Sequence, residues 1–379
     1  MEKKNKIIAA IIIMALIIIV ALIGFLLFLP KSTLPSNYLV KIDNFAFNMH
    51  DDGVAFYGDW IAWCERESAE IIGAKHNIYL YNTSTGTKTL INKEPARITG
   101  LALYDNKLVW SDNREGGEDP YSANISIYMY DIETKNETRL TSGDGAWMEM
   151  YEDNIVWVDN TYSPFGPYHI YLYKISSDEK QHVSSNIVEG SVITGTTNLP
   201  IPAIYENLIV WKRLDENNND SIYSYDIETQ QKRAIVSNLS GYDYLKRDIA
   251  IYKDNIAYGD GTSIYLYNFS DDSISFIMKH LKAESAHSDA HFSVIGIYEN
   301  IILAAETSLD LVGSDMYERF TKYWTYNIET GEKTEIEAGL IISEGKILGF
   351  LNDYYYILFS KVEQPSTVAL YLTDINDLF

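Results

Sequence analysis

Two stretches of the sequence carry residue types that ligate metal ions. In the first, Asp215, Asn217 and Asn219 alternate along a polar run. Short carboxylate and amide side chains at alternate positions open calcium-binding loops, because their oxygens converge on one hard cation. The glycine and the terminal glutamate of such a loop are missing, and Asp220 and Asp226 stand in their places. The stretch is compatible both with a calcium site and with a polar hairpin turn.

The second stretch contains His287, Asp289 and His291, with His280 nearby. Neutral imidazoles and a carboxylate are zinc ligands, and alternate residues of a strand share a face. The alternative to a metal site is that these histidines are solvated in a loop between two repeats. Calcium at the first stretch is thus the cofactor that the sequence suggests, with a second metal site at the histidines, and the sequence requires neither.

Other chemistry is poorly supported. No Gly-x-Ser-x-Gly elbow for a nucleophilic serine occurs in the chain. The net charge of −23 and the lack of a basic stripe argue against a nucleic-acid partner. The single cysteine, Cys64, cannot form an internal disulfide, and its place in a predicted strand predicts a buried, unreactive thiol.

Sequons for N-linked glycans fall in or beside predicted turns, as surface attachment outside a cell requires. The acceptor residues are Asn82, Asn124, Asn136, Asn219, Asn238 and Asn268.

The elements that would position these residues repeat along the chain. An aromatic residue ends a short apolar run at intervals of 46 to 54 residues. A second repeat position follows six residues later and is aromatic in every unit except the sixth, which has Ala304. The first positions are Tyr57, Tyr104, Tyr151, Tyr205, Tyr252, Tyr298 and Phe350, and the second are Trp63, Trp110, Trp157, Trp211, Tyr258, Ala304 and Tyr356. Most of these aromatic residues are expected to pack between repeats rather than to bind a ligand.

Each unit predicts four antiparallel strands with turns rich in Asn, Asp, Thr and Gly. Strands such as 108–110 and 170–173 leave no polar face, so they need cover on both sides. Sheets stacked between neighbouring sheets supply that cover. The expected fold is therefore all-β, a seven-bladed β-propeller of four-stranded antiparallel blades over residues 38–379.

The ends of the array predict ring closure. The seventh unit lacks its fourth strand, and a surplus strand at residues 39–42 precedes the first unit. We expect this strand to complete the last blade beside Tyr371, which removes the exposed edges of an open array. An open array with capped ends is the alternative.

Three segments depart from the period, at residues 185–204, 279–291 and 305–320, the last of which is expected to form a long inner loop. Insertions in repeat folds fall on loops, and loops often carry binding. Aromatic residues expected in loops, and therefore free for contact, are Tyr121, Tyr162, Phe165 and Tyr168.

The N-terminus predicts a membrane anchor. Residues 7–29 form an uninterrupted run of 23 apolar residues, which as a helix is long enough for the ~30 Å hydrocarbon layer. Lys3, Lys4 and Lys6 precede the run, and this bias predicts a cytoplasmic N-terminus with the remainder outside the cell. We expect residues 1–30 to be a cytoplasmic stub and an uncleaved transmembrane signal anchor, and residues 31–37 a linker. A cleaved signal peptide is the competing interpretation.

The recurring pattern Asn-x-Ile-Val-Trp followed by Ile-Tyr-x-Tyr-Asp-Ile-Glu-Thr resembles the TolB-type propeller repeat, as does the Asp112-Asn113-Arg114-Glu115-Gly116 loop after Trp110. Related blades occur in dipeptidyl peptidase IV-like proteins and in archaeal surface-layer propellers. The resemblance covers residues 38–379 and implies a secreted or envelope-facing interaction module. The α/β domain of TolB and the hydrolase domain of the peptidases have no counterpart in the sequence.

These features predict a single-pass membrane protein that displays a propeller outside the cell and binds envelope protein or glycan without catalysis. The alternative is an enzyme, such as a lyase or glycosidase, that uses carboxylates and histidines at the mouth of the central channel.

Overall fold

The computed structural model divides the chain into two compact units, Met1–Tyr38 and Leu39–Phe379. The structure describes residues 40–46, 53–67, 75–116, 124–159, 168–185, 200–214, 220–239, 248–279, 291–311, 317–336, 345–351, 356–364 and 367–374, all of them in the second unit. The expected anchor at residues 7–29 and the linker at 31–37 lie outside these ranges. Across the described residues, no helix is both long enough and apolar enough to cross a membrane.

The second unit is built from four-stranded antiparallel sheets. Six sheets each take four strands that are consecutive in the chain, and a further sheet takes the last three strands together with the first. The first three sheets are β2 (Val54–Tyr57), β3 (Trp60–Arg66), β4 (His76–Asn82) and β5 (Thr87–Leu90); β6 (Ile98–Tyr104), β7 (Lys107–Asp112), β8 (Ser126–Asp131) and β9 (Asn136–Ser142); and β10 (Gly145–Tyr151), β11 (Asn154–Asp159), β12 (His169–Lys174) and β13 (Glu179–Ser185).

The next three sheets repeat this order. They are β14 (Pro202–Tyr205), β15 (Leu208–Leu214), β16 (Asp220–Asp226) and β17 (Lys232–Leu239); β18 (Ile249–Tyr252), β19 (Asn255–Gly259), β20 (Ser263–Asn268) and β21 (Ser273–Lys279); and β22 (His291–Tyr298), β23 (Ile301–Leu311), β24 (Tyr317–Asn327) and β25 (Lys333–Ile336). The last sheet holds β26 (Gly345–Leu351), β27 (Tyr356–Gln364), β28 (Thr367–Asp374) and β1 (Val40–Ala46). A single 3₁₀ turn is described, at Arg114–Gly116.

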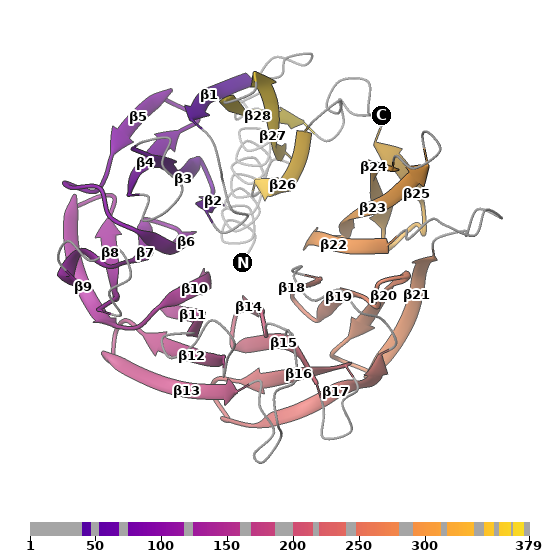
Figure 1. Ribbon diagram of the computed structural model, residues 1–379. Helices are drawn as coiled ribbons and strands as arrows, with labels where there is room; N and C mark the ends of the chain where they lie inside the picture. The colour runs from indigo at the N-terminus through magenta and orange to yellow at the C-terminus, as the bar shows by residue number, and fades with distance from the viewer. Residues whose placement is uncertain are drawn as a thin grey trace, which may run out of the picture. The chain divides into compact units, whose positions relative to one another are not determined.

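The sheets of this unit are set around a common centre (Figure 1). The innermost strands are β2, β6, β10, β14, β18, β22 and β26. Burial falls from the middle strands outward: every residue of β11 is buried, whereas every residue of β5 is exposed. Each core cluster is shared by two neighbouring sheets. Leu80 packs in one cluster with Trp110, for example, and Val156 packs in another with Trp211. The strands without a polar face are therefore covered on both sides, as their sequence predicts.

Two kinds of tight turn recur in the six sheets whose strands are consecutive in the chain. The first and second strands are joined by two-residue loops whose first residue has a positive φ, as at Gly58 and Asp105. The third and fourth strands are joined by turns in which an Asn or Asp side chain accepts a backbone hydrogen bond, as Asp131 Oδ1 does from Thr134 N at 2.7 Å. The polar turn residues of the repeat thus act as the sequence analysis expects.

The two ends of the second unit meet in one sheet. β1 pairs antiparallel with β28, and Lys41 lies opposite Tyr371. This is the pairing that the surplus N-terminal strand predicts, although the strand runs on to Ala46. It gives β28 a partner on its outer side and leaves β1 as the edge.

The prediction of a long inner loop at residues 305–320 is wrong. β23 and β24 are 11-residue strands that stay paired from Ile301 opposite Asn327 to Leu311 opposite Tyr317. The extra residues lengthen the two paired strands of the hairpin and do not form a long loop between them. The segment contains β-branched and aromatic residues such as Thr307 and Phe320, which favour a strand.

Candidate functional site: a tyrosine-lined cavity

The innermost strand of six sheets ends in a tyrosine. These residues are Tyr57, Tyr104, Tyr151, Tyr205, Tyr252 and Tyr298. Each is followed at once by the two-residue loop to the next strand, so the strand end and its side chain are held at the same height in every sheet. We call this set the tyrosine collar.

Rings of the tyrosine collar pack on one another from sheet to sheet. The centroids of Tyr57 and Tyr104 are 4.3 Å apart, and the four further neighbouring pairs lie at 4.9 to 5.2 Å. The rings are tilted by 41° to 60°, an arrangement in which the edge of one ring meets the face of the next. The tyrosine collar therefore links neighbouring sheets at the centre of the fold.

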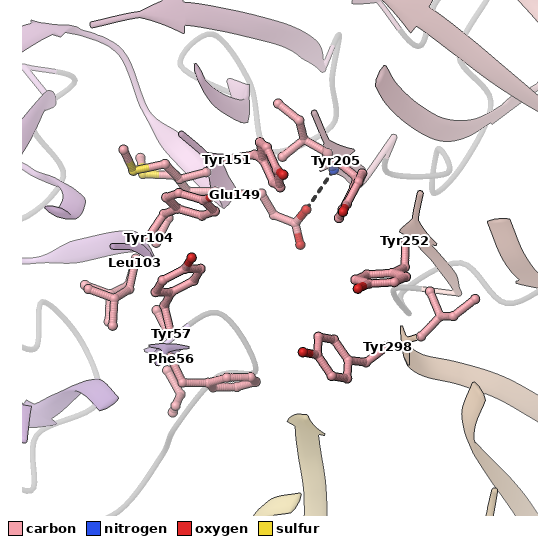
Figure 2. A pocket seen from close by; sticks show the side chains of 17 residues that line it. Phe56, Tyr57, Leu103, Tyr104, Glu149, Tyr151, Tyr205, Tyr252 and Tyr298 are labelled. Atoms are coloured by element: carbon pink, nitrogen blue, oxygen red, sulfur yellow. Dashed lines mark hydrogen bonds between the residues drawn. The ribbon is translucent and has the colours of Figure 1, made fainter. Parts of the chain in front are cut away.

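The collar borders a cavity of about 420 Å³. Phe56, Leu103, Met148, Met150, Ile204 and Ile297 contribute its apolar walls. Figure 2 shows the tyrosines reaching from successive sheets around one open space, with the carboxylate of Glu149 among them. Glu149 is the one acidic side chain among the described residues that line this space.

Two tyrosines of the collar stay uncharged over the ordinary pH range. Burial raises the pKa of Tyr104, and the neighbouring Tyr57 hydroxyl adds to this effect. Burial and the neighbouring Tyr151 raise the pKa of Tyr205 in the same way. The phenol groups therefore remain available as hydrogen-bond donors.

Glu149 already serves the fold. Its Oε2 accepts a hydrogen bond from the Ile204 backbone N–H at 3.0 Å, across the boundary between two sheets. The cavity thus offers ring faces, hydroxyl groups and one carboxylate. That set suits a ligand that stacks on aromatic rings and exchanges hydrogen bonds, and the described lining residues include no second carboxylate and no imidazole beside Glu149.

A second repeated group of side chains lies on the second and third strands. Trp63, Trp110 and Trp157 are fully buried, and each stacks on a tyrosine of the next strand at 5.8 to 6.0 Å. Trp110 Nε1 donates to Asp112 Oδ2 at 2.8 Å, and Arg114 binds the same carboxylate. Trp63 Nε1 likewise donates to Glu65, which pairs with Lys88 at 3.1 Å. We call this arrangement the Trp–acid–cation group.

The metal-ligand candidates stay predictions. Asp215, Asn217 and Asn219 lie outside the described residues, in the connection between β15 and β16. His280, His287 and Asp289 also lie outside them, and His291 is placed as the first residue of β22. Among the described side chains, no group of three His, Cys, Asp or Glu is placed to share a metal ion.

The glycosylation candidates differ in exposure. Asn124 and Asn136 are exposed, whereas Asn82 is only 9% exposed and its Oδ1 accepts a hydrogen bond from Thr85 N. Asn268 donates to Asn255 Oδ1 at 3.0 Å. Asn219 lies outside the described residues, and Asn238 is placed in β17 without a described side chain.

Two expectations about single residues have clear outcomes. Tyr168 is not free for contact, because it is buried, with 8% of its surface exposed. Tyr121, Tyr162 and Phe165 lie outside the described residues. Cys64 lies in β3 and is only half-buried as a residue, although burial of its thiol raises the pKa to about 12.

Comparisons with known proteins agree with this architecture. No family model and no curated protein matches the chain. Among solved structures, the β-propeller domain of the Trilobed protease from Pyrococcus furiosus matches with a TM-score of 0.55 at 12% identity, over 89% of this chain and 97% of that chain. The chain has a β-propeller fold.

Two further propeller matches have TM-scores of 0.54. Acylaminoacyl peptidase from Pyrococcus horikoshii is 12% identical, over 89% of this chain and 52% of that chain. Oligogalacturonate lyase from Vibrio parahaemolyticus is 11% identical, over 89% and 92%. TolB from Acinetobacter baumannii superposes less well, with a TM-score of 0.38. At these identities the matches show the fold alone.

One contrast concerns the ends of the array. The Pyrococcus furiosus domain has an open velcro topology. In this propeller β1 pairs with β28, so the first and last strands of the unit share a sheet.

Sequence reasoning found the positions of the tyrosine collar but not its role. Seven repeat positions were expected to pack between repeats, and six of them are tyrosines that also border a cavity. The available signal was that each tyrosine stands directly before a tight turn at the end of an innermost strand. A purely apolar packing role does not require a hydroxyl there, and leucine or phenylalanine would serve equally well.

Proposed function

We propose that this protein is a closed seven-bladed propeller, displayed outside the cell by a single membrane span at residues 7–29, that binds envelope protein or glycan without catalysis. The bound group would enter the cavity bordered by the tyrosine collar. The N-terminus would lie in the cytoplasm.

The anchor is supported by the sequence. The 23 apolar residues at 7–29 suffice to span a bilayer, and three lysines precede them. A propeller tethered in this way faces the envelope, where proteins and glycans are the abundant ligands.

The observation that carries the binding proposal is the cavity itself. A concave site of about 420 Å³ with mainly aromatic and aliphatic walls and a few hydroxyl groups is typical of ligand pockets. Sugar rings present C–H faces that stack on tyrosine and hydroxyl groups that bond to phenols. Side chains of a protein loop with an aromatic or aliphatic tip fit the same walls.

The enzyme alternative rests on Glu149. A lyase or glycosidase needs at least one further acid or base beside it, and the other described lining residues offer only the tyrosine hydroxyls for that role. Residues outside the described ranges could supply one only by reaching the cavity.

Binding can be tested with the purified full chain in detergent and a panel of immobilised envelope polysaccharides and proteins. We expect saturable binding to a member of the panel without turnover. Tyr252→Ala removes ring contacts with both Tyr205 and Tyr298, so we expect at least about tenfold weaker binding, or ~1.4 kcal/mol. Tyr252→Phe, which keeps the ring, is the matched control.

Turnover of a panel polysaccharide by the wild-type chain, lost in Glu149→Gln, would favour the enzyme instead. Equal binding by Tyr252→Ala and the wild type, with both folded by circular dichroism, would remove the cavity from the proposal. Alkaline extraction of cell membranes tests the anchor separately: the full chain should stay with the lipid, and a chain lacking residues 1–30 should not.

A further inference from the structure

The sheet of β14–β17 departs from the Trp–acid–cation group at one position. In five of the other six sheets, an acid stands two residues after the second aromatic position of the repeat or its equivalent, and in the last sheet Leu358 stands there. This sheet has arginine at that place. The acids are Glu65, Asp112, Asp159, Asp260 and Glu306, and the arginine is Arg213.

Trp211 is held in the same pose as its counterparts. It is fully buried and stacks on Tyr223 at 6.0 Å with 18° between the planes, close to the 5.9 Å and 27° of Trp63 on Tyr79. Trp63 Nε1 donates to Glu65 at 2.9 Å. Trp211 Nε1 is buried with no acceptor among the described residues, and its sheet lacks the carboxylate that accepts from Trp63. Trp157 Nε1 also lacks an acceptor, although Asp159 stands beside it in sequence.

A second cation stands next to Arg213. Lys232 is opposite Tyr225 in its hairpin, as Lys88 is opposite Tyr81 and Lys180 opposite Tyr173. Lys88 pairs with Glu65. For Lys232 the charged neighbour is Arg213. The pKa of Lys232 is lowered, first by burial and then by the positive charge of Arg213. Arg213 and Lys232 thus place two positive charges side by side, whereas Lys88 and Glu65 of the first sheet combine one positive charge with one negative charge.

Ionisable rings of the preceding sheet extend this cluster. Arg213 donates to the Ser185 carbonyl at 3.2 Å, and the Ser185 hydroxyl lies 3.0 Å from His182 Nε2 and 2.9 Å from His169 Nδ1. Burial lowers the pKa of His182, and His169 and Lys232 lower it further. The two histidines are 3.3 Å apart, a spacing that a metal ion could bridge. The neighbouring positive charges of Arg213 and Lys232 disfavour a metal cation at that place.

We propose that Arg213, Lys232 and His182 form a binding site for an oxyanion, either a sulfate or phosphate ester or a carboxylate of an acidic ligand. Guanidinium and ammonium groups hold such oxygens by charge-assisted hydrogen bonds. The ligand's negative charge takes the place of the acid that five other sheets carry at the position of Arg213. In a chain with a net charge of −23, these neighbouring positive side chains would favour anions over cations.

This site is separate from the tyrosine collar, since none of its residues lines that cavity. It therefore stands whether or not the proposed function of the cavity is correct.

The indole N–H of Trp211 gives a direct readout. The full chain, labelled with ¹⁵N-tryptophan, is titrated with sodium sulfate and with sodium glucuronate against sodium chloride at matched ionic strength, and Trp211→Phe assigns the resonance. We expect a saturable shift of this resonance with one or both oxyanions and none with chloride. A stronger effect of sulfate indicates a sulfated or phosphorylated ligand, and a stronger effect of glucuronate indicates a carboxylated one.

Three variants test the assignment. Arg213→Asp restores the acid found in the neighbouring sheets, and Lys232→Ala removes an exposed lysine without touching the core; each should weaken the binding at least about tenfold. Lys174→Ala, an exposed lysine at the far end of β12, should leave it unchanged. The proposal is overturned if chloride shifts the resonance as much as the oxyanions do, or if both Arg213→Asp and Lys232→Ala bind as the wild type does.

Discussion

Two aromatic positions six residues apart have different roles at the scale of single residues. The tryptophan position is fully buried between sheets, and its indole N–H is paired with an acid in two of the sheets. The tyrosine position is half-buried at the centre, where ring contacts pass from one sheet to the next. A tyrosine suits that place because one side of the ring faces its neighbours while the hydroxyl meets the cavity.

The tyrosine collar should therefore contribute to stability as well as to binding. Tyr104 contacts the rings of both Tyr57 and Tyr151. We predict that Tyr104→Ala lowers the free energy of unfolding by about 2–3 kcal/mol, less than for a fully buried ring because the residue is half-buried. Tyr104→Phe should cost less than about 1 kcal/mol. Urea unfolding followed by circular dichroism measures both, and an equal loss in the two variants would show that the hydroxyl, not the ring packing, matters.

Raised tyrosine pKa values predict a loss of stability in alkali. Burial raises the pKa of Tyr104 and Tyr205, and burial with the Asp178 carboxylate raises that of Tyr173 to about 12. In the unfolded chain tyrosine ionises near pH 10, at about its reference value. The folded state thus holds these protons more tightly, so the stabilisation is fully present below about pH 10 and is lost as the pH rises through the folded pKa values.

We accordingly expect the free energy of unfolding to fall steeply above about pH 10. Urea unfolding between pH 8 and pH 11.5 tests this, with ultraviolet absorbance of phenolate as an independent measure. Titration of every tyrosine near pH 10 in the folded protein, or stability that does not change up to pH 11.5, would contradict the expectation.

At the scale of elements, the two-residue loops between first and second strands set where each innermost strand ends. The first residue of these loops has a positive φ, at 50° for Glu152 and for Glu206. A single positive φ at this position is the pattern of a type II′ hairpin turn, which favours glycine there. Only the first sheet has glycine, Gly58.

Replacing an exposed loop residue by glycine should therefore stabilise the fold. We predict that Glu152→Gly raises the free energy of unfolding by about 0.5–1 kcal/mol, since removal of Cβ relieves more strain than the added freedom of the unfolded chain costs. Glu152→Val should lower it by about 1–2 kcal/mol, because a β-branched residue tolerates positive φ poorly. Thermal unfolding of the two variants gives the comparison, and stabilisation by valine would rule out the backbone explanation.

Sequence patterns predicted these elements well where the period was regular. The strand of residues 170–173 and its neighbours were predictable because every position is apolar or aromatic and turn residues flank them. The 305–320 hairpin was misread because its length breaks the period, and an insertion can extend two paired strands as easily as form a loop. The proximity of Arg213 to Lys232 was not predictable, because it depends on which side chains the non-adjacent strands β15 and β17 bring together.

At the scale of the whole molecule, the proposed ring depends on the sheet built from both ends of the second unit. β1 contacts β28 within that sheet and also contacts β3 of the first sheet. Without β1, the edge of β28 would be unpaired, and unpaired edges favour association between chains. The pairing of β1 with β28 therefore joins the start of the array to its end.

Disulfide trapping of the two ends tests this closure most directly. Lys41→Cys and Tyr371→Cys, introduced together into a Cys64→Ser chain, place the two thiols on opposed residues of β1 and β28, where paired strands bring Cα atoms within bridging distance. Lys41→Cys with Val368→Cys is the control, because Val368 is opposite Phe45 instead. The closed propeller predicts an intramolecular disulfide in the first pair and not in the second, independent of protein concentration. Failure of the first pair to oxidise, or equal oxidation of both pairs, would contradict the closed ring.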